Sequence, residues 1–445
     1  MSRLVVPVLL LALALPITPA RAQTAPDDST RTERWTLPNG LRVVTRSIPG
    51  SRSVAMTMAY RMGMDDDPAG RAGLAQLLGD LAFTAPAGDL PARTPGDMES
   101  LSPLGWSYPV LRHVTLLTEV TDTGRFPVVL DHVARRMRDV TVDDAALKAS
   151  RARVKSELRE QLFGQPAQVL NHQLREIAAG RTDAQMLAHA SGADVDKVTV
   201  KEAQEALRRW HVPANAVLSM VGDFGPIDVK RLVQERFGNI PGGVAQPETP
   251  VKLAPTTRTM RRQGSSSGAI AVLAPALTDT THASFYMAAM VLGSMCEDGW
   301  NRGVQPQPRF QYALVDEPEM FRVFPPVPAG ENDPGRLVFQ LASATEQLPS
   351  LLVQTTEFAK LRTSVSTVLG GPMPADQRRI LRSNPGVLHT LARSQATCEL
   401  RMGPAFWDDY RRRLDQVSAT SLGVWQPWMD DPKHQVVLLL SAQPK

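Results

Sequence analysis

The sequence predicts an α+β fold in which two similar domains each combine a mostly antiparallel sheet with long helices. Extended apolar segments joined by turn signals alternate with long segments of helical periodicity. The two halves of the chain also end alike, and a stretch rich in proline and glycine separates them. With 445 residues, 43% of them hydrophobic and 21% charged, the chain is long enough for two cores.

The first half opens with a hairpin and continues into helices. Pro38-Asn39-Gly40 is a turn signal between two extended segments. Further along we expect strands at 53–60 and 113–120, a loop at 85–96, and helices at 127–140 and 143–163. Between the first of these strands and the loop, a helix with one buried face is indicated by the spacing of Leu74, Leu77, Leu78 and Leu81.

A faint internal repeat supports the two-domain reading. Val198-Thr199 and Val417-Ser418 each open a helix-like segment that runs to a proline and then to an apolar strand. The stretch 239–250 is rich in proline and glycine and lacks periodicity. We therefore expect an N-terminal domain at 32–240, a linker at 241–250 and a C-terminal domain at 251–445.

The N-terminus has the pattern of an export signal. Arg3 precedes the apolar run Leu4–Leu15, and Ala20-Arg21-Ala22 follows as a small-x-small cleavage pattern. The run is shorter than the roughly 20 apolar residues that a membrane span needs. We expect residues 1–22 to be a signal peptide and the mature chain to be periplasmic or secreted, without a stable membrane anchor.

Charge and cysteine content exclude some classes of protein and leave one question open. The net charge of +4 gives no indication of a nucleic-acid partner. Cys296 and Cys398 are the two cysteines, so a Cys-x-x-Cys zinc or redox centre is absent. An exported chain permits a disulfide between them, and two buried free thiols fit the sequence equally well.

Five segments of the first domain, taken in order, resemble the zinc-peptidase family of pitrilysin, insulinase and the mitochondrial processing peptidase. They are Leu37–Val44, Gly73–Phe83, Leu104–Tyr108, Pro213–Asp223 and Phe237–Pro241. In the second domain the resemblance rests mainly on the stretch from about Trp407 to Leu440. It implies that the two domains together form half of a clamshell.

In this family a helix carries the inverted motif H-x-x-E-H, whose two His bind zinc while its Glu acts on the attacking water. The resemblance places Gln76 at the first His, Gly79 at the catalytic Glu and Asp80 at the second His. Glu157 would be the retained third ligand. On a helix Gln76, Gly79 and Asp80 share one face, although the polar face of any amphipathic helix would look the same.

These substitutions predict that zinc and catalysis are lost. A neutral carboxamide such as Gln76 is a poor zinc ligand. Gly79 has no side chain to accept a proton, and loss of a general base alone costs about 10²- to 10⁴-fold in rate. No two of the eight histidines stand three to five residues apart, and no G-x-S-x-G motif offers a serine nucleophile. We expect no catalytic residue and no cofactor.

The family also carries an Arg and a Tyr that grip the substrate backbone, and here Arg302 or Arg309 with Tyr312 would correspond. Such proteases divide their four domains between two chains in some members. The resemblance therefore implies an inactive subunit that pairs with a zinc-bearing homologue around peptide substrates. The alternatives are a stand-alone peptide-binding or envelope scaffolding module, and an active metallopeptidase that uses Gln76, Asp80 and Glu157.

Overall fold

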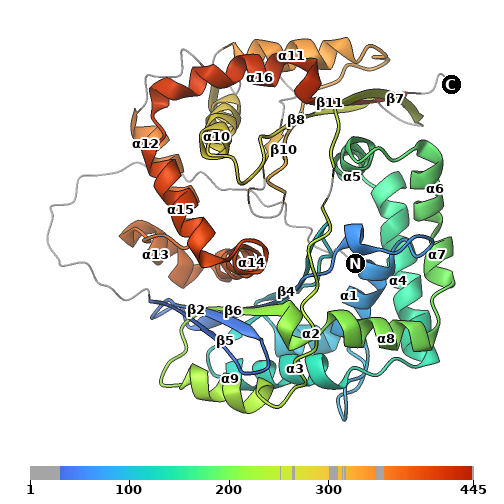
Figure 1. Ribbon diagram of the computed structural model, residues 1–445, viewed down its shortest axis with the longest axis vertical. Coiled ribbons are helices and arrows are strands. Elements are labelled where there is room, and N and C mark those ends of the chain that lie inside the picture. The colour runs from blue at the N-terminus through green and yellow to red at the C-terminus, as the bar shows by residue number, and fades with distance from the viewer. Residues whose placement is uncertain are drawn as a thin grey trace, which may run out of the picture.

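Two mixed sheets, one in each half of the chain, organise the protein in this computed structural model (Figure 1). The structure describes residues 31–250, 252–262, 266–299, 309–312, 314, 317–346, 348 and 355–442. The expected signal peptide at 1–22 lies outside these residues. Among the described helices, none is long and apolar enough to cross a membrane.

The first sheet has the strand order β1-β2-β6-β3-β5-β4. Its strands are β1 (Thr32–Thr36), β2 (Arg42–Ser47), β3 (Ser53–Tyr60), β4 (Gly105–Ser107), β5 (Thr115–Asp122) and β6 (Ala216–Gly222). Only β2 and β6 pair in parallel. The predicted hairpin is β1–β2, and its turn is fixed by the Asn39 side chain, which donates to the carbonyls of Phe237 and Ile240 at 2.8 and 3.0 Å.

The second sheet has the order β7-β11-β8-β10-β9. Its strands are β7 (Thr256–Arg262), β8 (Ser267–Leu273), β9 (Arg309–Gln311), β10 (Met320–Phe324) and β11 (Gln435–Ala442). Again one pair, β7 with β11, is parallel and the others are antiparallel. Both sheets are thus mostly antiparallel, and the α+β prediction is confirmed.

Helices separate and cover the strands. Those of the first half are α1 (Leu74–Thr84), α2 (Pro95–Leu101), α3 (Phe126–Asp139), α4 (Asp144–Phe163), α5 (Pro166–Ala178), α6 (Asp183–Ser191), α7 (Ala193–Asp196), α8 (Val200–Trp210) and α9 (Val229–Phe237). Those of the second half are α10 (His282–Gly299), α11 (Gly335–Thr345), α12 (Thr355–Val368), α13 (Ala375–Ser383), α14 (Pro385–Arg401), α15 (Gly403–Gln416) and α16 (Gln426–Asp430).

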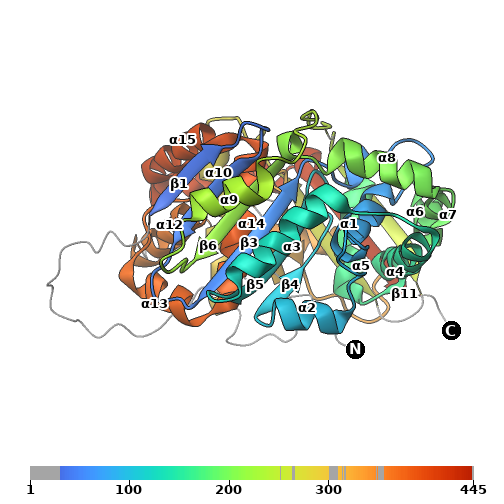
Figure 2. The ribbon, with the colours of Figure 1, turned by 90° about the horizontal axis from the view of Figure 1, so that it is seen from below.

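Each sheet is covered on one face by helices of its own half and on the other by a helix of the other half. Alternate strand residues of the first sheet pack on α3 and α9 through one core, and their neighbours pack on α14 from the second half. The second sheet likewise packs on its own α10, α11 and α15 through one core and on α5 from the first half through another. In Figure 2, α3 and α9 lie in front of the first sheet and α14 lies behind it. The halves therefore exchange one helix each.

Arginines of the first sheet secure the C-terminal end of α14. Arg42 donates to the carbonyl of Glu399 at 2.7 Å, and Arg61 donates to the carbonyl of Leu400. Arg34 forms an ion pair with the Glu399 carboxylate. The last carbonyls of a helix lack partners within the helix and carry partial negative charge, so these cations satisfy and stabilise the end of α14.

A buried charge cluster secures the other exchanged helix. Glu317, which precedes β10, forms ion pairs with Arg322 of β10 and with Arg175 of α5. The side chains of Glu317 and Arg322 are 4% and 2% exposed, and that of Arg175 is 17% exposed. One carboxylate thus joins the second sheet to a helix that belongs to the first half.

His211, after α8, should make the fold sensitive to acid. It is 6% exposed, packs against Tyr60 with 4.4 Å between the centroids of the tilted rings, and has no hydrogen-bond partner for either ring nitrogen among the described residues. Burial lowers the pKa of His211 to about 3. Below about pH 6.5, the ordinary pKa of histidine, His211 is protonated in the unfolded chain but stays neutral in the folded chain. The free energy of unfolding therefore falls by up to about 1.4 kcal/mol per pH unit as the pH decreases.

We expect His211→Leu to reduce the dependence of the free energy of unfolding on pH. Urea denaturation of both proteins at pH 7, 6 and 5 would measure it, and the variant should gain stability relative to the wild type as the pH falls. A difference between the two proteins that stays constant over this range would contradict the assignment.

Candidate functional site

Helix α1, which carries the residues that the resemblance aligns with the zinc motif, starts at an acidic cap. The Asp67 carboxylate accepts the backbone N–H groups of Gly73 and Ala75 at 2.7 and 2.8 Å, which satisfies two donors at the helix start. All residues of α1 are buried. The prediction of one buried face is therefore wrong: the leucine face packs on the local core, and the face of Gln76, Gly79 and Asp80 is covered as well.

Helix α4 covers that second face and runs antiparallel to α1. A Cβ on Gly73 would lie 3.2 Å from the Leu158 side chain, whereas Asp80 contacts Arg153, five residues earlier on α4. This pairing places Gln76 at the level of Glu157. The structure thus brings the positions singled out in the sequence onto two facing helices.

An arginine that the sequence pattern did not reveal occupies this interface. The Arg153 guanidinium binds the Asp80 carboxylate through two parallel contacts, Nη2 to Oδ1 at 2.6 Å and Nε to Oδ2 at 2.9 Å, and it also donates to Thr84. Burial alone would lower the pKa of Arg153. The hydrogen bond to Asp80 and the charge of Asp80 outweigh this effect and raise the pKa above its usual value. A fixed positive charge therefore sits beside the carboxylate at the second ligand position.

The position of the catalytic Glu is closed to side chains. A Cβ built on Gly79 would lie 2.7 Å from Cγ2 of Val110 and 3.2 Å from Cγ2 of Thr115. Real Cβ atoms do not approach other atoms as closely as the first of these distances. The Val110 and Thr115 methyl groups thus take the space into which a residue-79 side chain would point.

Gln76 completes a donor set that does not fit zinc. It is 3% exposed, and neither atom of its amide has a hydrogen-bond partner among the described residues. The described part of the chain contains no group of three His, Cys, Asp or Glu side chains that could hold a metal ion. A neutral amide, a carboxylate already paired with arginine and one glutamate make a poor zinc site, because zinc prefers imidazole and thiolate.

An aromatic group borders this helix pair at the edge of the first sheet. Phe83 stacks on Tyr108 at 4.6 Å and on Trp106 at 6.0 Å between ring centroids. Trp106 lies on β4, which pairs with β5 alone among the described strands and so forms an edge of the sheet. The alternation of Trp106 and Tyr108 in a short extended segment was the signal for this feature, and our sequence analysis did not use it.

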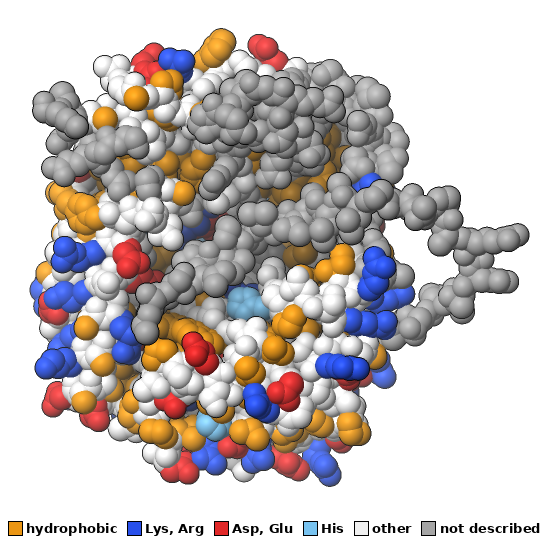
Figure 3. Space-filling model, turned by 180° about the vertical axis from the view of Figure 1, so that it is seen from behind, with side chains coloured by type: hydrophobic (Ala, Val, Ile, Leu, Met, Phe, Trp, Pro, Cys, Tyr) orange, Lys and Arg blue, Asp and Glu red, His pale blue; other side chains and the backbone are white. Residues whose placement is uncertain are grey.

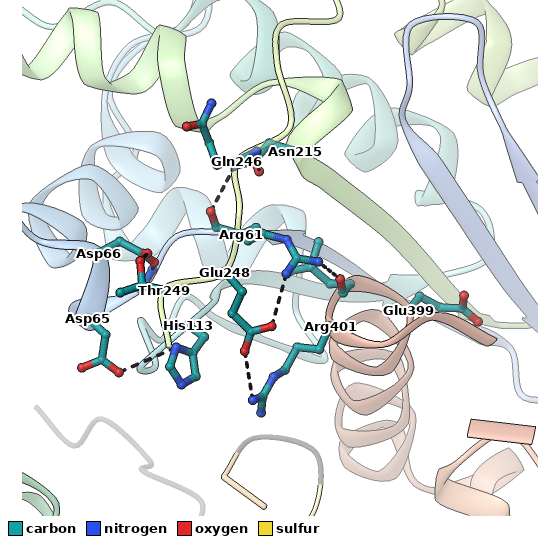
Figure 4. A network of polar contacts seen from close by, with 12 residues as sticks. Arg61, Asp65, Asp66, His113, Asn215, Gln246, Glu248, Thr249, Glu399 and Arg401 are labelled. Carbon is teal, nitrogen blue, oxygen red and sulfur yellow. Dashed lines mark hydrogen bonds and ion pairs between the residues drawn. The ribbon is translucent and has the colours of Figure 1, made fainter. Parts of the chain in front are cut away.

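The segment that joins the halves is fixed by charge. Glu248 lies between Arg61, which follows β3, and Arg401 of α14, with N–O distances of 3.3 and 3.1 Å (Figure 4). Burial alone would lower the pKa of Arg401. The nearby carboxylates of Glu319 and Glu248 outweigh this effect and raise the pKa above its usual value. One linker carboxylate therefore contacts both halves.

Further contacts hold the same segment against the first half. The backbone N–H of Gln246 donates to the side-chain oxygen of Asn215 at 3.0 Å, and the Thr249 hydroxyl donates to Asp66 (Figure 4). Although the composition of 241–250 is typical of a free linker, its described residues make specific contacts.

Of the residues expected to grip substrate, Arg302 lies outside the described residues, and Arg309 and Tyr312 lie in the second half. Arg309 begins β9. Tyr312 is 7% exposed, packs against Phe285 and Tyr286, and donates its hydroxyl to the carbonyl of Pro318 at 2.8 Å. Burial raises the pKa of Tyr312 well above its usual value. The surroundings of Tyr312 are those of a core residue.

The cysteines also lie in the second half. Cys398 is buried on α14, where its carbonyl accepts a hydrogen bond from the Trp407 indole at 2.9 Å. Cys296 belongs to α10.

Comparison with known proteins gives one family match and many matches in fold. Residues 197–314 match the family model described as the peptidase M16 inactive domain. No curated protein sequence matches the chain. The matched residues run from the end of the first half, across the joining segment, into the second sheet.

Solved structures share the fold over nearly the whole chain at low sequence identity. A protease from Helicobacter pylori has a TM-score of 0.74 at 16% identity, with 93% of this chain and 99% of that chain covered. The periplasmic protease PqqL from Escherichia coli has a TM-score of 0.66 at 14% identity, with 95% of this chain and 48% of that chain covered. A peptidase M16 inactive domain from Pseudomonas fluorescens has a TM-score of 0.64 at 16% identity, with 93% and 98% covered.

The family match and the shared fold agree with the order of motif segments along the first half. The chain is thus similar to the M16 peptidases, the family of pitrilysin and insulinase, in its fold and over residues 197–314, and the positions that the resemblance aligns with the zinc motif hold Gln76, Gly79 and Asp80.

Proposed function

We propose that this protein is a catalytically inactive subunit that pairs with a zinc-bearing homologue and completes a chamber for peptide degradation. The observation that carries the proposal is the Asp80–Arg153 ion pair. This pair would leave Asp80 unavailable as a metal ligand, and Gly79 supplies no proton acceptor. Both features support a loss of zinc, in which case catalysis would come from another chain.

The match to a longer protease supports the need for a partner. The chain aligns with 48% of the PqqL chain. A unit that corresponds to half of such a protease, and whose donor set suits zinc poorly, would fit the second half of a divided clamshell. The homologue would supply the zinc, and this chain would supply the opposite wall of the chamber.

The place of action would be the periplasm or the external medium. The signal-peptide pattern at 1–22 would direct the chain to export. The similar protease PqqL is described as periplasmic. The partner would accordingly be an exported homologue with H-x-x-E-H intact.

Co-expression with such a homologue from the native host tests the proposal. We expect the two chains to co-elute in size-exclusion chromatography and to cleave peptides in a chelator-sensitive reaction that neither chain performs alone. A partner variant with its catalytic Glu changed to Gln should still pair but should not cleave. Separate elution, or full activity of the homologue by itself, would refute the subunit role.

A stand-alone peptide-binding or scaffolding module is the second candidate, and the edge strand β4 favours it. An edge strand exposes backbone donors and acceptors to which an extended peptide can add, and Trp106 and Tyr108 offer aromatic surface beside it. This function predicts that the chain alone binds unfolded peptides with micromolar affinity. The subunit function predicts that tight binding requires the homologue.

A further inference from the structure

A groove of about 850 Å³ runs along the side of α4 that faces away from α1. At 100° per residue, Lys148, Lys155 and Arg159 share one face of this helix, and Arg153 and Glu157 lie on the opposite face. The α6–α7 region, through Ser191 and Asp196, forms the other wall. The groove is thus separate from the substituted zinc site.

The groove is lined by more basic than acidic side chains. Lys148 and Arg159 are exposed and have no ion-pair partner among the described residues. Lys155 pairs with Asp196, and Arg151 donates to the carbonyl of Val198. Figure 3 shows several basic side chains along its left edge, the side of the molecule where α4, α6 and α7 lie. Two cationic groups therefore remain available to a ligand.

One end of the groove is apolar. Phe163, the last residue of α4, lines it and is 62% exposed, an unusual state for a large apolar side chain. Between Lys148 and Arg159 the lining includes the small side chains of Ala152 and Ser156. A chain lying on α4 could therefore approach the helix closely.

We propose that this groove docks an acidic segment of a protein partner, with carboxylates against Lys148 and Arg159 and an apolar residue against Phe163. The acidic side chains Glu160 and Asp196 in the lining favour polypeptide over nucleic acid, because they repel a continuous run of phosphates. A polypeptide can place its own donors beside them. The exposed Phe163 ring suits an apolar side chain at the end of the segment.

The charges set how this contact responds to salt. Exposed complementary charges mainly accelerate association, and salt screens them. Affinity should accordingly fall as the salt concentration rises, while the contribution of Phe163 remains. The groove does not depend on subunit pairing, so its test is independent of the proposed function.

The test uses a fluorescein-labelled peptide in which three glutamates alternate with three serines and two leucines follow, with fluorescence anisotropy on the full chain. We expect Lys148→Glu combined with Arg159→Glu to weaken binding by about tenfold or more, and Phe163→Ala to weaken it by about threefold. The matched control is Lys201→Glu with Arg208→Glu on the exposed face of α8, which makes the same change in net charge and should alter binding by less than about twofold.

Three outcomes would overturn the proposal. The first is equal weakening by the α4 and α8 variants, which would mean that only net charge matters. The second is no measurable binding of the acidic peptide at low salt. The third is binding of duplex DNA or anionic lipid vesicles that the α4 reversal abolishes while peptide binding persists, which would assign the groove to a different class of ligand.

Discussion

Replacing Glu317 with alanine should lower the free energy of unfolding by about 3–5 kcal/mol, because two arginines would lose the carboxylate that neutralises them. Arg322 is 2% exposed and belongs to the second sheet, and Arg175 reaches the same carboxylate from α5 of the first half. A charge left without its partner in the interior cannot regain its hydration. The loss of Glu317 should therefore destabilise both the second sheet and the packing of α5 against it.

Chemical denaturation followed by tryptophan fluorescence and far-UV circular dichroism would measure this loss. Asp183→Ala is the matched control, since Asp183 also pairs with an arginine of the other half, Arg258, but is 56% exposed; it should cost less than about 1 kcal/mol. If the Glu317 variant is too unstable to purify, replacing Glu317, Arg175 and Arg322 together by Leu, Met and Met should restore a folded protein. A loss below about 1 kcal/mol for Glu317→Ala would show that the cluster does not secure the helix exchange.

The sequence predicted most strands of the first sheet and β11 of the second, because the central strands are buried on two faces, but it did not locate β7 to β10. All residues of β3 and β6 are buried, so these strands read as continuous apolar runs that few other structures produce. The Pro-Asn-Gly turn of the first hairpin was equally clear, since its geometry is local. Such signals depend only on neighbouring residues.

The exchange of α5 and α14 could not be predicted in the same way. The apolar face of either helix fits any sheet, and nothing local in the sequence says which sheet it will cover. The arginines that secure the end of α14, Arg34, Arg42 and Arg61, also look like ordinary polar residues of strands. Their role follows from contacts with residues more than 300 positions away.

The candidate site likewise combines features that the sequence predicted with contacts that it could not predict. The substitutions at 76, 79 and 80 could be identified because the flanking segments fixed their register. The sequence could not show that Arg153 binds Asp80 or that Val110 fills the space beside Gly79, because both contacts join distant elements. These two contacts would oppose a metal and a glutamate at these positions, so we expect that restoring the motif alone does not create a zinc site.

Restoring only the motif, with Gln76→His, Gly79→Glu and Asp80→His, should therefore give weak zinc binding or none. A glutamate side chain introduced at position 79 would clash with Val110 at its Cβ, and Arg153 would lose its carboxylate and place a positive charge beside the metal. Adding Val110→Ala and Arg153→Ala removes both obstacles. We expect the five-residue variant to bind zinc about 10- to 100-fold more tightly than the triple variant, the range by which residues around a metal site typically alter affinity.

Competition with a zinc-sensitive dye and metal analysis after dialysis would measure both affinities. Glu157→Ala in the five-residue variant is the control, because α4 places this glutamate at the level of position 76 and its loss should remove the third ligand and most of the bound zinc. Strong zinc binding by the triple variant would mean that Arg153 and Val110 are not obstacles. A folded five-residue variant that takes up no zinc would instead mean that α1 and α4 do not present these three positions to a common point, and the zinc-site register would then be wrong.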